Sequence, residues 1–219
     1  MIKTMLQSLM LLKDPFWDDY AMRREPLIGR ISDEQKAEFI KNARRCGEAL
    51  ADEVCEKCGK LRPEAYAKKL GLTVEHINGK DDGNYTMFAC FNEPDHISVF
   101  QETIKQTDLL IQEQELAELL GSIHTEDILI AHELYHYFEC IRPNLYTNQK
   151  LLCLWKIGKL QNLSKVVSLQ EIGAMAFAQQ LLHLSFSPFV FDVLLLYSQN
   201  KRLAKNLYES ILNYSDKKE

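Results

Sequence analysis

The sequence has no run of about 18 apolar residues, which a membrane-spanning helix would need, and it has no excess of basic residues. A surface that coats nucleic acid needs such an excess, whereas this chain of 219 residues carries a formal net charge of −5. The segment 1–17 has a short apolar patch without a small-residue cleavage site, which argues against a signal peptide. We therefore expect a cytoplasmic protein with no nucleic-acid partner and no membrane partner.

Close pairs of cysteines are also scarce. The six cysteines are spread along the chain, and without an export signal we interpret them as reduced thiols. Cys55 and Cys58 form a single CxxC motif, which Cys46 and Cys90 would have to complete to make a structural zinc site. Structural zinc sites usually present a second close pair, so we favour free thiols at a helix end over a second metal.

The first half of the chain contains a long helical pattern. Segment 32–59 predicts an amphipathic helix, because Ser32 is a good N-cap and Gly59 a good C-terminal stop. A shorter helix is expected to begin at Pro63 and to end at Gly71. No internal repeat or low-complexity segment interrupts the chain, and its 46% of hydrophobic residues can form one core.

The next segments change in texture. Between residues 72 and 100, short stretches rich in β-branched and aromatic residues alternate with turn residues, which predicts a small antiparallel sheet. Helical patterns dominate from residue 102 onward, and the apolar stretches 151–155 and 189–197 are expected to be core helices. This order of elements predicts an α+β fold that is mainly helical.

The most informative stretch is EDILIAHELYHYFEC, residues 126–140, which contains an HExxH motif. Residues four apart on a helix lie one turn apart on one face, so His132 and His136 can bind one ion at the roughly 2.0–2.1 Å that zinc requires. Glu133 lies beside them, within reach of a water molecule that the metal activates. Their immediate neighbours are uncharged, and two histidines and a glutamate would be costly to bury there without a partner. The pattern favours a metal site over an accidental match.

A catalytic zinc normally takes three protein ligands and keeps a fourth position for water. Glu171 is the first carboxylate after Glu139, and the small residues Gly173 and Ala174 would let its helix pack closely against the HExxH helix. The alternative is that Glu171 is only an acidic residue favoured by the N-terminal end of a helix.

Two segments resemble the ImmA/IrrE-type metallopeptidase family, a gluzincin-like group with an HExxH motif and a downstream glutamate. They are ILIAHELYHYFE, residues 128–139, and the pattern ExxAxxFAxxLL that starts at Glu171. Weaker similarity extends the resemblance to residues 33–184. The chain departs from the family pattern at Tyr135, where glycine is usual, at His183, which follows the two leucines in place of proline, and in a longer gap between the second histidine and the glutamate.

The resemblance implies a zincin-like metallopeptidase domain over residues 32–219, preceded by an N-terminal extension over residues 1–31. It implies a site-specific zinc protease that cleaves a partner protein such as a helix-turn-helix repressor. The ligands of Zn²⁺ would be His132, His136 and Glu171, with Glu133 as general base.

Two parts of this mechanism stay open in the sequence. The donor that stabilises the oxyanion is not identified, and His183, Tyr146 and Tyr135 are its candidates. The substrate could lie alongside an edge strand, for which residues 96–100 are the first choice.

Two other functions fit the same motif. One is a zinc amidohydrolase that acts on an amide or ester other than a protein. The other is a zinc-binding sensor or protein-interaction module without turnover, against which Glu133 argues, because a structural site needs no base. We find no helix-turn-helix pattern in the chain, so any DNA binding would belong to a partner.

Overall fold

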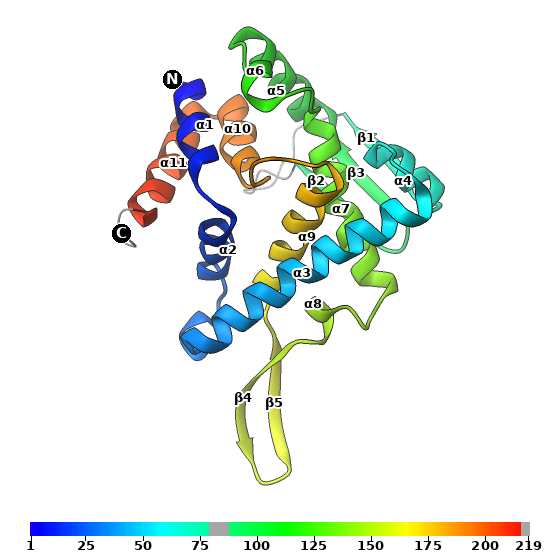
Figure 1. The fold of residues 1–219 in the computed structure, drawn as a ribbon, viewed down its shortest axis with the longest axis vertical. Coiled ribbons are helices and arrows are strands. Elements are labelled where there is room, and N and C mark those ends of the chain that lie inside the picture. Colours follow the sequence, from blue (N-terminus) through cyan, green and yellow to red (C-terminus); the bar gives the residue numbers. More distant parts are fainter. Residues whose placement is uncertain (79–87, 216–219) are drawn as a thin grey trace.

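The computed structural model describes residues 1–78 and 88–215, and its elements confirm the α+β class (Figure 1). The described elements are α1 (Ile2–Leu11), α2 (Asp14–Arg23), η1 (Ile28–Arg30), α3 (Asp33–Cys58), α4 (Pro63–Lys69), β1 (Thr73–Ile77), β2 (Ala89–Asn92), β3 (His96–Phe100), α5 (Gln101–Glu113), α6 (Ala117–Leu120), α7 (Thr125–Ile141), α8 (Tyr146–Gln149), β4 (Leu151–Ile157), β5 (Leu160–Lys165), α9 (Ser168–Leu181), α10 (Val190–Gln199) and α11 (Lys201–Ser215). No helix in this part of the chain is long and apolar enough to cross a bilayer.

The longest helix, α3, has the ends that the sequence predicts. The hydroxyl of Ser32 accepts a hydrogen bond from the backbone N–H of Gln35, whose side chain accepts one from the backbone N–H of Ser32. This capping box satisfies two donors that the first helical turn leaves free. At the other end Gly59 has a φ of 77°, which an L-residue rarely adopts. α3 crosses the body of the molecule and packs along α9 (Figure 1).

The three-stranded sheet is mixed, so the prediction of an antiparallel sheet is wrong in part. Its order is β1-β3-β2, with β1 parallel and β2 antiparallel to β3. Strand direction depends on the path of the connections, which local residue preferences do not encode. Of the strands predicted here, the part of residues 84–91 that precedes residue 88 lies outside the described residues.

Residues 96–100 form the central strand of this sheet. β3 pairs on both sides, and its Ile97 and Val99 are fully buried. It has no free edge, so the suggestion that a substrate lies alongside residues 96–100 is wrong. The strand with an edge toward α7 is β2.

The stretch 151–155 is a strand and not the expected core helix. It forms most of β4, which pairs with β5 in a two-stranded hairpin that extends from the helical body (Figure 1). Only Leu152 of β4 is buried. A five-residue apolar run has no periodicity that distinguishes a helix from a strand. The second stretch, 189–197, does lie mainly in a core helix, α10.

The first 31 residues pack into the same hydrophobic core as the rest of the chain. The fully buried side chains that α1 and α2 contribute are Ile2, Leu6, Leu9, Trp17 and Met22. The Arg44 guanidinium of α3 joins this region to the body, because it donates to both carboxylate oxygens of Asp18 in α2, at 2.6 and 2.9 Å, and to Gln179 of α9 at 3.2 Å. The N-terminal helices are therefore part of the packed structure.

Candidate metal centre

Two helices, α7 and α9, carry the candidate metal ligands and pack against each other. α7 begins at Thr125 and ends at Ile141, one residue beyond the end expected near Cys140. His124 is its N-cap, and the hydroxyl of Thr125 donates to Asp108 on α5. α9 begins at Ser168, which places Glu171 in its first turn.

Glycine allows the close approach of these helices. A Cβ at Gly173 would lie 2.3 Å from the hydroxyl oxygen of Tyr135, so the tyrosine that replaces the usual glycine between the histidines lies over α9. On the other side of α9, a Cβ at Gly47 of α3 would lie 2.1 Å from the carbonyl oxygen of Gly173. The close packing predicted from Gly173 is therefore present, and it involves α3 as well.

The side chains of His132, His136 and Glu171 converge on one point. The Nε2 atoms of the two histidines are 3.1 Å apart, and they lie 3.5 Å and 3.8 Å from the Glu171 carboxylate oxygens. Two ligands of a tetrahedral zinc ion, each at about 2.0–2.1 Å from the metal, are separated by roughly 3.3 Å. The observed spacings bracket this value, and this is the one group of its kind in the described part of the chain. The three side chains fit a divalent ion.

A second carboxylate fixes the orientation of His136. The Nδ1–H of His136 donates to Glu139 at 3.0 Å, since a carboxylate can only accept, and this leaves the Nε2 lone pair directed at the other ligands. Glu139 is buried and also accepts from the hydroxyl of Thr147, which is 2.9 Å from that of Tyr135. Sequence reasoning missed this role of Glu139, although its position three residues after His136 on the same helix was a usable signal.

The charges around His136 affect its pKa. Burial alone lowers the pKa, but the hydrogen bond to Glu139 and the negative charges of Glu171 and Glu133 raise it, and the net direction is upward. His132 differs, because its Nδ1 is buried and has no hydrogen-bond partner among the described residues.

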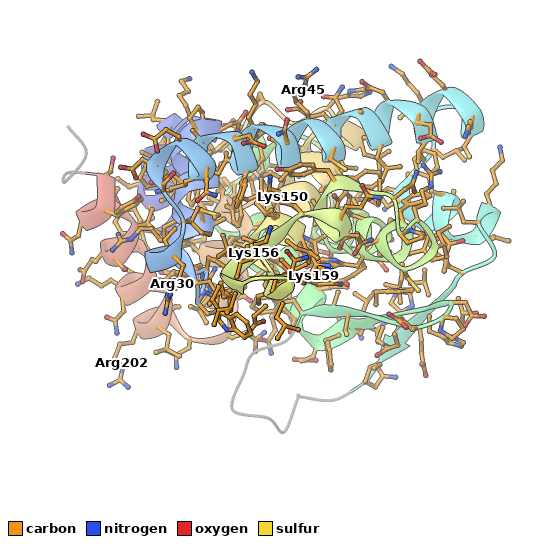
Figure 2. All side chains as sticks on the ribbon, turned by 90° about the horizontal axis from the view of Figure 1, so that it is seen from below. Arg30, Arg45, Lys150, Lys156, Lys159 and Arg202 are labelled. Carbon is orange, nitrogen blue, oxygen red and sulfur yellow. The ribbon has the colours of Figure 1, made fainter. Side chains whose placement is uncertain are left out.

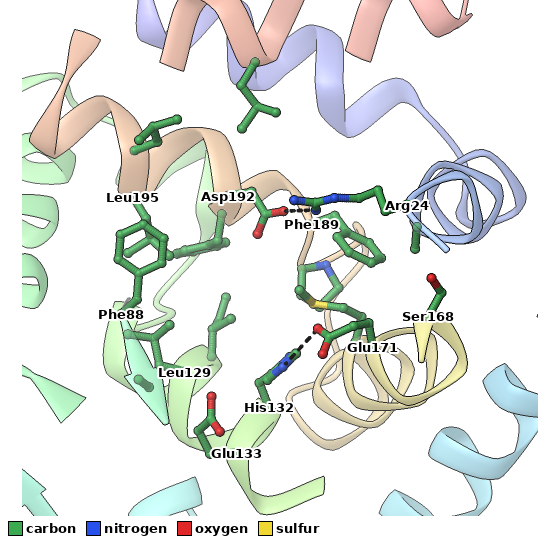
Figure 3. A pocket seen from close by; sticks show the side chains of 18 of the residues that line it. Arg24, Phe88, Leu129, His132, Glu133, Ser168, Glu171, Phe189, Asp192 and Leu195 are labelled. Atoms are coloured by element: carbon green, nitrogen blue, oxygen red, sulfur yellow. Dashed lines mark ion pairs between the residues drawn. The ribbon is translucent and has the colours of Figure 1, made fainter. Parts of the chain in front are cut away.

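Glu133 lies beside the ligands and is held by the sheet. Its Oε2 accepts a hydrogen bond of 2.7 Å from the backbone N–H of Phe91, in the edge strand β2. The side chain is buried and lines the same cavity as His132 and Glu171 (Figure 3). The other carboxylate oxygen remains able to accept a proton from a water molecule at the centre.

The cavity has a volume of about 670 Å³ and is lined mainly by apolar side chains. Across it from Glu171 lie Arg24 and Asp192, with a nitrogen and an oxygen 4.0 Å apart (Figure 3). Burial, opposed by Arg24 and assisted by Glu171, raises the pKa of Asp192 to about 7. Sequence reasoning missed both residues, because nothing in the chain links positions 24 and 192. The apolar lining includes Phe88, Ile128, Leu129, Met175, Phe189, Leu195 and Leu196.

The three candidate oxyanion donors are not among the residues that line the cavity. Tyr135 is fully buried with its hydroxyl engaged by Thr147. The Tyr146 hydroxyl is buried without a hydrogen-bond partner among the described residues. His183 follows α9 with a backbone φ of 52°.

The cysteines considered for a second zinc do not form a metal-binding group within the described residues. All six are free, and the sulfur of Cys55 lies 3.5 Å from the hydroxyl of Tyr66. This agrees with the interpretation of Cys55 and Cys58 as thiols at a helix end.

Comparisons of the chain with protein-family models, with curated proteins and with solved structures return no match.

Proposed function

We propose that the protein is a zinc-dependent metallopeptidase of the ImmA/IrrE type, with a zincin-like fold, that cleaves a cytoplasmic partner protein such as a helix-turn-helix repressor. The observation that carries the proposal is the convergence of His132, His136 and Glu171 beside the carboxylate of Glu133. A purely structural site would need no base at this position. The resemblance of the two helical segments to that family supports peptidase chemistry over other hydrolysis.

A bound zinc ion would supply Lewis acidity, lowering the pKa of a water molecule toward neutrality and polarising the scissile carbonyl. Glu133 accepts the proton of the attacking water on the oxygen that Phe91 leaves free, and then donates it to the leaving amine. The Phe91 hydrogen bond holds the carboxylate in place during both transfers. Glu139 keeps the correct tautomer of His136 through the whole cycle.

The substrate lies alongside β2 in this proposal. Phe88 and Ala89 line the cavity at the start of this edge strand, and the Phe91 N–H faces Glu133. An extended peptide can add to such an edge through backbone hydrogen bonds. This places the scissile bond next to the general base.

The test combines metal content with cleavage. Elemental analysis of the purified protein should find one equivalent of zinc, and Glu171→Ala should lose it. Glu118→Ala removes the same charge at an exposed position and should keep the zinc. Glu133→Gln should retain zinc and lose cleavage of a panel of helix-turn-helix repressors. A wild-type rate in Glu133→Gln, or a wild-type protein without metal, would contradict the proposal.

The cavity favours one alternative, a zinc amidohydrolase that acts on a small molecule. Its volume of about 670 Å³ lies within the range of about 300–1,000 Å³ that is usual for small-ligand sites. Turnover of small amides by the wild type and not by Glu133→Gln, with no cleavage of any protein, would favour it. A zinc-binding sensor would instead turn over neither kind of substrate.

A further inference from the structure

The β4–β5 hairpin is the part of the fold that the metal centre does not explain. It connects α8 to α9 and extends from the helical body (Figure 1). The seven residues of β4, at about 3.3 Å per residue, give it a length of roughly 20 Å. An isolated two-stranded hairpin is marginally stable in water. A projection of this length suggests contact with something outside the molecule.

Three large apolar side chains lie on one face of the hairpin near its tip. Ile157 and Leu160 are paired across the strands, and Trp155 is two residues before Ile157, so all three share a face. Their exposed fractions are 72%, 70% and 48%, respectively. Single exposed apolar residues are ordinary, but a cluster at the end of a projection indicates an interaction site.

The hairpin is also basic, in a chain that is acidic as a whole. Residues 150–165 contain four lysines and no acidic residue, whereas the chain carries a net charge of −5. Figure 2 shows the lysines at positions 150, 156 and 159 on the hairpin. Lys150 pairs with Glu38, but Lys156, Lys159 and Lys165 are exposed and have no ion-pair partner among the described residues. The free lysines complement a negatively charged partner.

We propose that the hairpin tip binds an anionic lipid bilayer, with Trp155, Ile157 and Leu160 inserted at the headgroup level and Lys156 and Lys159 contacting lipid phosphates. Apolar side chains bordered by lysine are typical of peripheral membrane contacts, and tryptophan favours the membrane interface. The expectation of no membrane partner rests on the lack of a spanning segment, which a peripheral contact does not need.

The shape of the hairpin favours a bilayer over a protein. A narrow tip needs a matching groove in a protein partner to bury its side chains, whereas lipid headgroups rearrange around it. Two copies of the chain would bring the lysines of two hairpins together, which is unfavourable. The contact is independent of the chemistry at the metal centre, so its failure and the failure of the proposed function are separate outcomes.

The experiment uses vesicle flotation and tryptophan fluorescence on the full chain. The protein should float with phosphatidylcholine vesicles that contain phosphatidylserine and not with phosphatidylcholine alone. Raising the salt from about 0.1 M to about 1 M shortens the screening length from about 10 Å to about 3 Å and should release it. Trp155 should shift its emission to shorter wavelength on binding, whereas Trp17 is fully buried and should not respond. The variant Trp155→Phe should abolish the shift.

Matched variants distinguish the tip from the rest of the surface. Leu160→Asp should weaken vesicle binding by about tenfold or more, while Leu109→Asp, at a similarly exposed leucine of α5, should not. Lys156→Gln and Lys159→Gln should each reduce binding roughly fivefold, and Lys41→Gln and Lys60→Gln should have little effect. All four lysines are exposed, so the variants should keep the wild-type zinc content and unfolding midpoint.

Two results would overturn the inference. The first is a wild-type protein that does not bind anionic vesicles, or one that binds them equally well with Leu160→Asp. The second is a tip variant that loses cleavage of a partner protein or changes its oligomeric state while vesicle binding is unaffected, which would assign the hairpin to protein binding.

Discussion

His136 is fixed through both of its ring nitrogens. Glu139 holds Nδ1, and Nε2 faces His132 and Glu171. Glu139 is itself held by Thr147, whose hydroxyl also contacts Tyr135. Tyr135, the residue that departs from the family pattern, therefore supports a metal ligand through two hydrogen bonds. This relay gives a direct prediction for metal affinity.

Glu139→Ala should weaken zinc binding about 10- to 100-fold, the usual effect of losing a carboxylate behind a histidine ligand. The physical reason is that His136 loses the acceptor that fixes its tautomer and ring orientation. Zinc affinity can be measured by competition with a chromophoric chelator. Glu126→Ala removes a carboxylate from the same helix, where it pairs with His76 and not with a candidate ligand, and should leave the affinity unchanged. Equal affinities for the two variants would rule out the supporting role of Glu139.

At the scale of elements, the position of Glu171 depends on how α9 packs between α7 and α3. Gly173 accommodates the ring of Tyr135 from α7, and Gly47 accommodates the backbone of α9 from α3. At Gly47 the obstacle is a carbonyl oxygen of the backbone, which a rotamer change cannot move. Any added side chain there displaces one helix from the other.

Gly47→Ala should therefore lower the free energy of unfolding by about 3 kcal/mol, at the upper end of typical overpacking costs. Gly29→Ala is the matched control, because a Cβ at Gly29 would have no atom within 4 Å. Urea denaturation measures both, and zinc content reports whether Glu171 stays in place. A Gly47→Ala protein as stable as Gly29→Ala would show that the two helices can separate freely.

A second contact between elements gives a pH dependence. Hydrogen bonds from Arg142, at the end of α7, and from Lys57 lower the pKa of Glu53 on α3 to about 2. The carboxyl titrates near 4.5 when the chain is unfolded, so its stabilising effect is present above pH 4.5 and is lost as the pH falls toward 2. Because the side chain of Glu53 is 36% exposed, we expect an effect of less than about 1 kcal/mol.

The measurement is the urea midpoint at several pH values within this window. The wild type should lose more stability on acidification than Arg142→Gln, in which the main cause of the lowered pKa is removed. Parallel pH profiles for the two proteins would contradict this assignment.

At the scale of the whole molecule, the two ends of the chain help to build the cavity. Arg24 and Pro26 from the N-terminal 31 residues and Leu207 from α11 line it together with the HExxH helix. The fully buried Trp17 stacks on Phe189, with ring centroids 5.8 Å apart. The first 31 residues are therefore needed for the core and for one wall of the site.

Two leucines of α1 test this role. Leu6 is fully buried and Leu11 is 76% exposed, so Leu6→Ala should lower the free energy of unfolding by about 2–5 kcal/mol, and Leu11→Ala by less than about 0.5 kcal/mol. Chemical denaturation provides both values. Nearly neutral effects at both positions would mean that α1 is only loosely attached to the body.

The sequence by itself determined the features that depend on neighbours within one or two helical turns. Ser32 and Gly59 set the ends of α3, because caps are local hydrogen bonds and local backbone angles. The four-residue spacing placed His132 and His136 on one face, because the helical repeat is fixed. Gly173 indicated a close helix contact because it lacks a side chain.

Only the tertiary structure decided which distant residues meet. It made β3 a central strand, turned residues 151–155 into a projecting hairpin, and placed Arg24 opposite Glu171. Strand direction and cavity walls depend on the path of the whole chain and on the packing of helices far apart in sequence. The energies that select them are summed over many contacts, so no short stretch of residues encodes them.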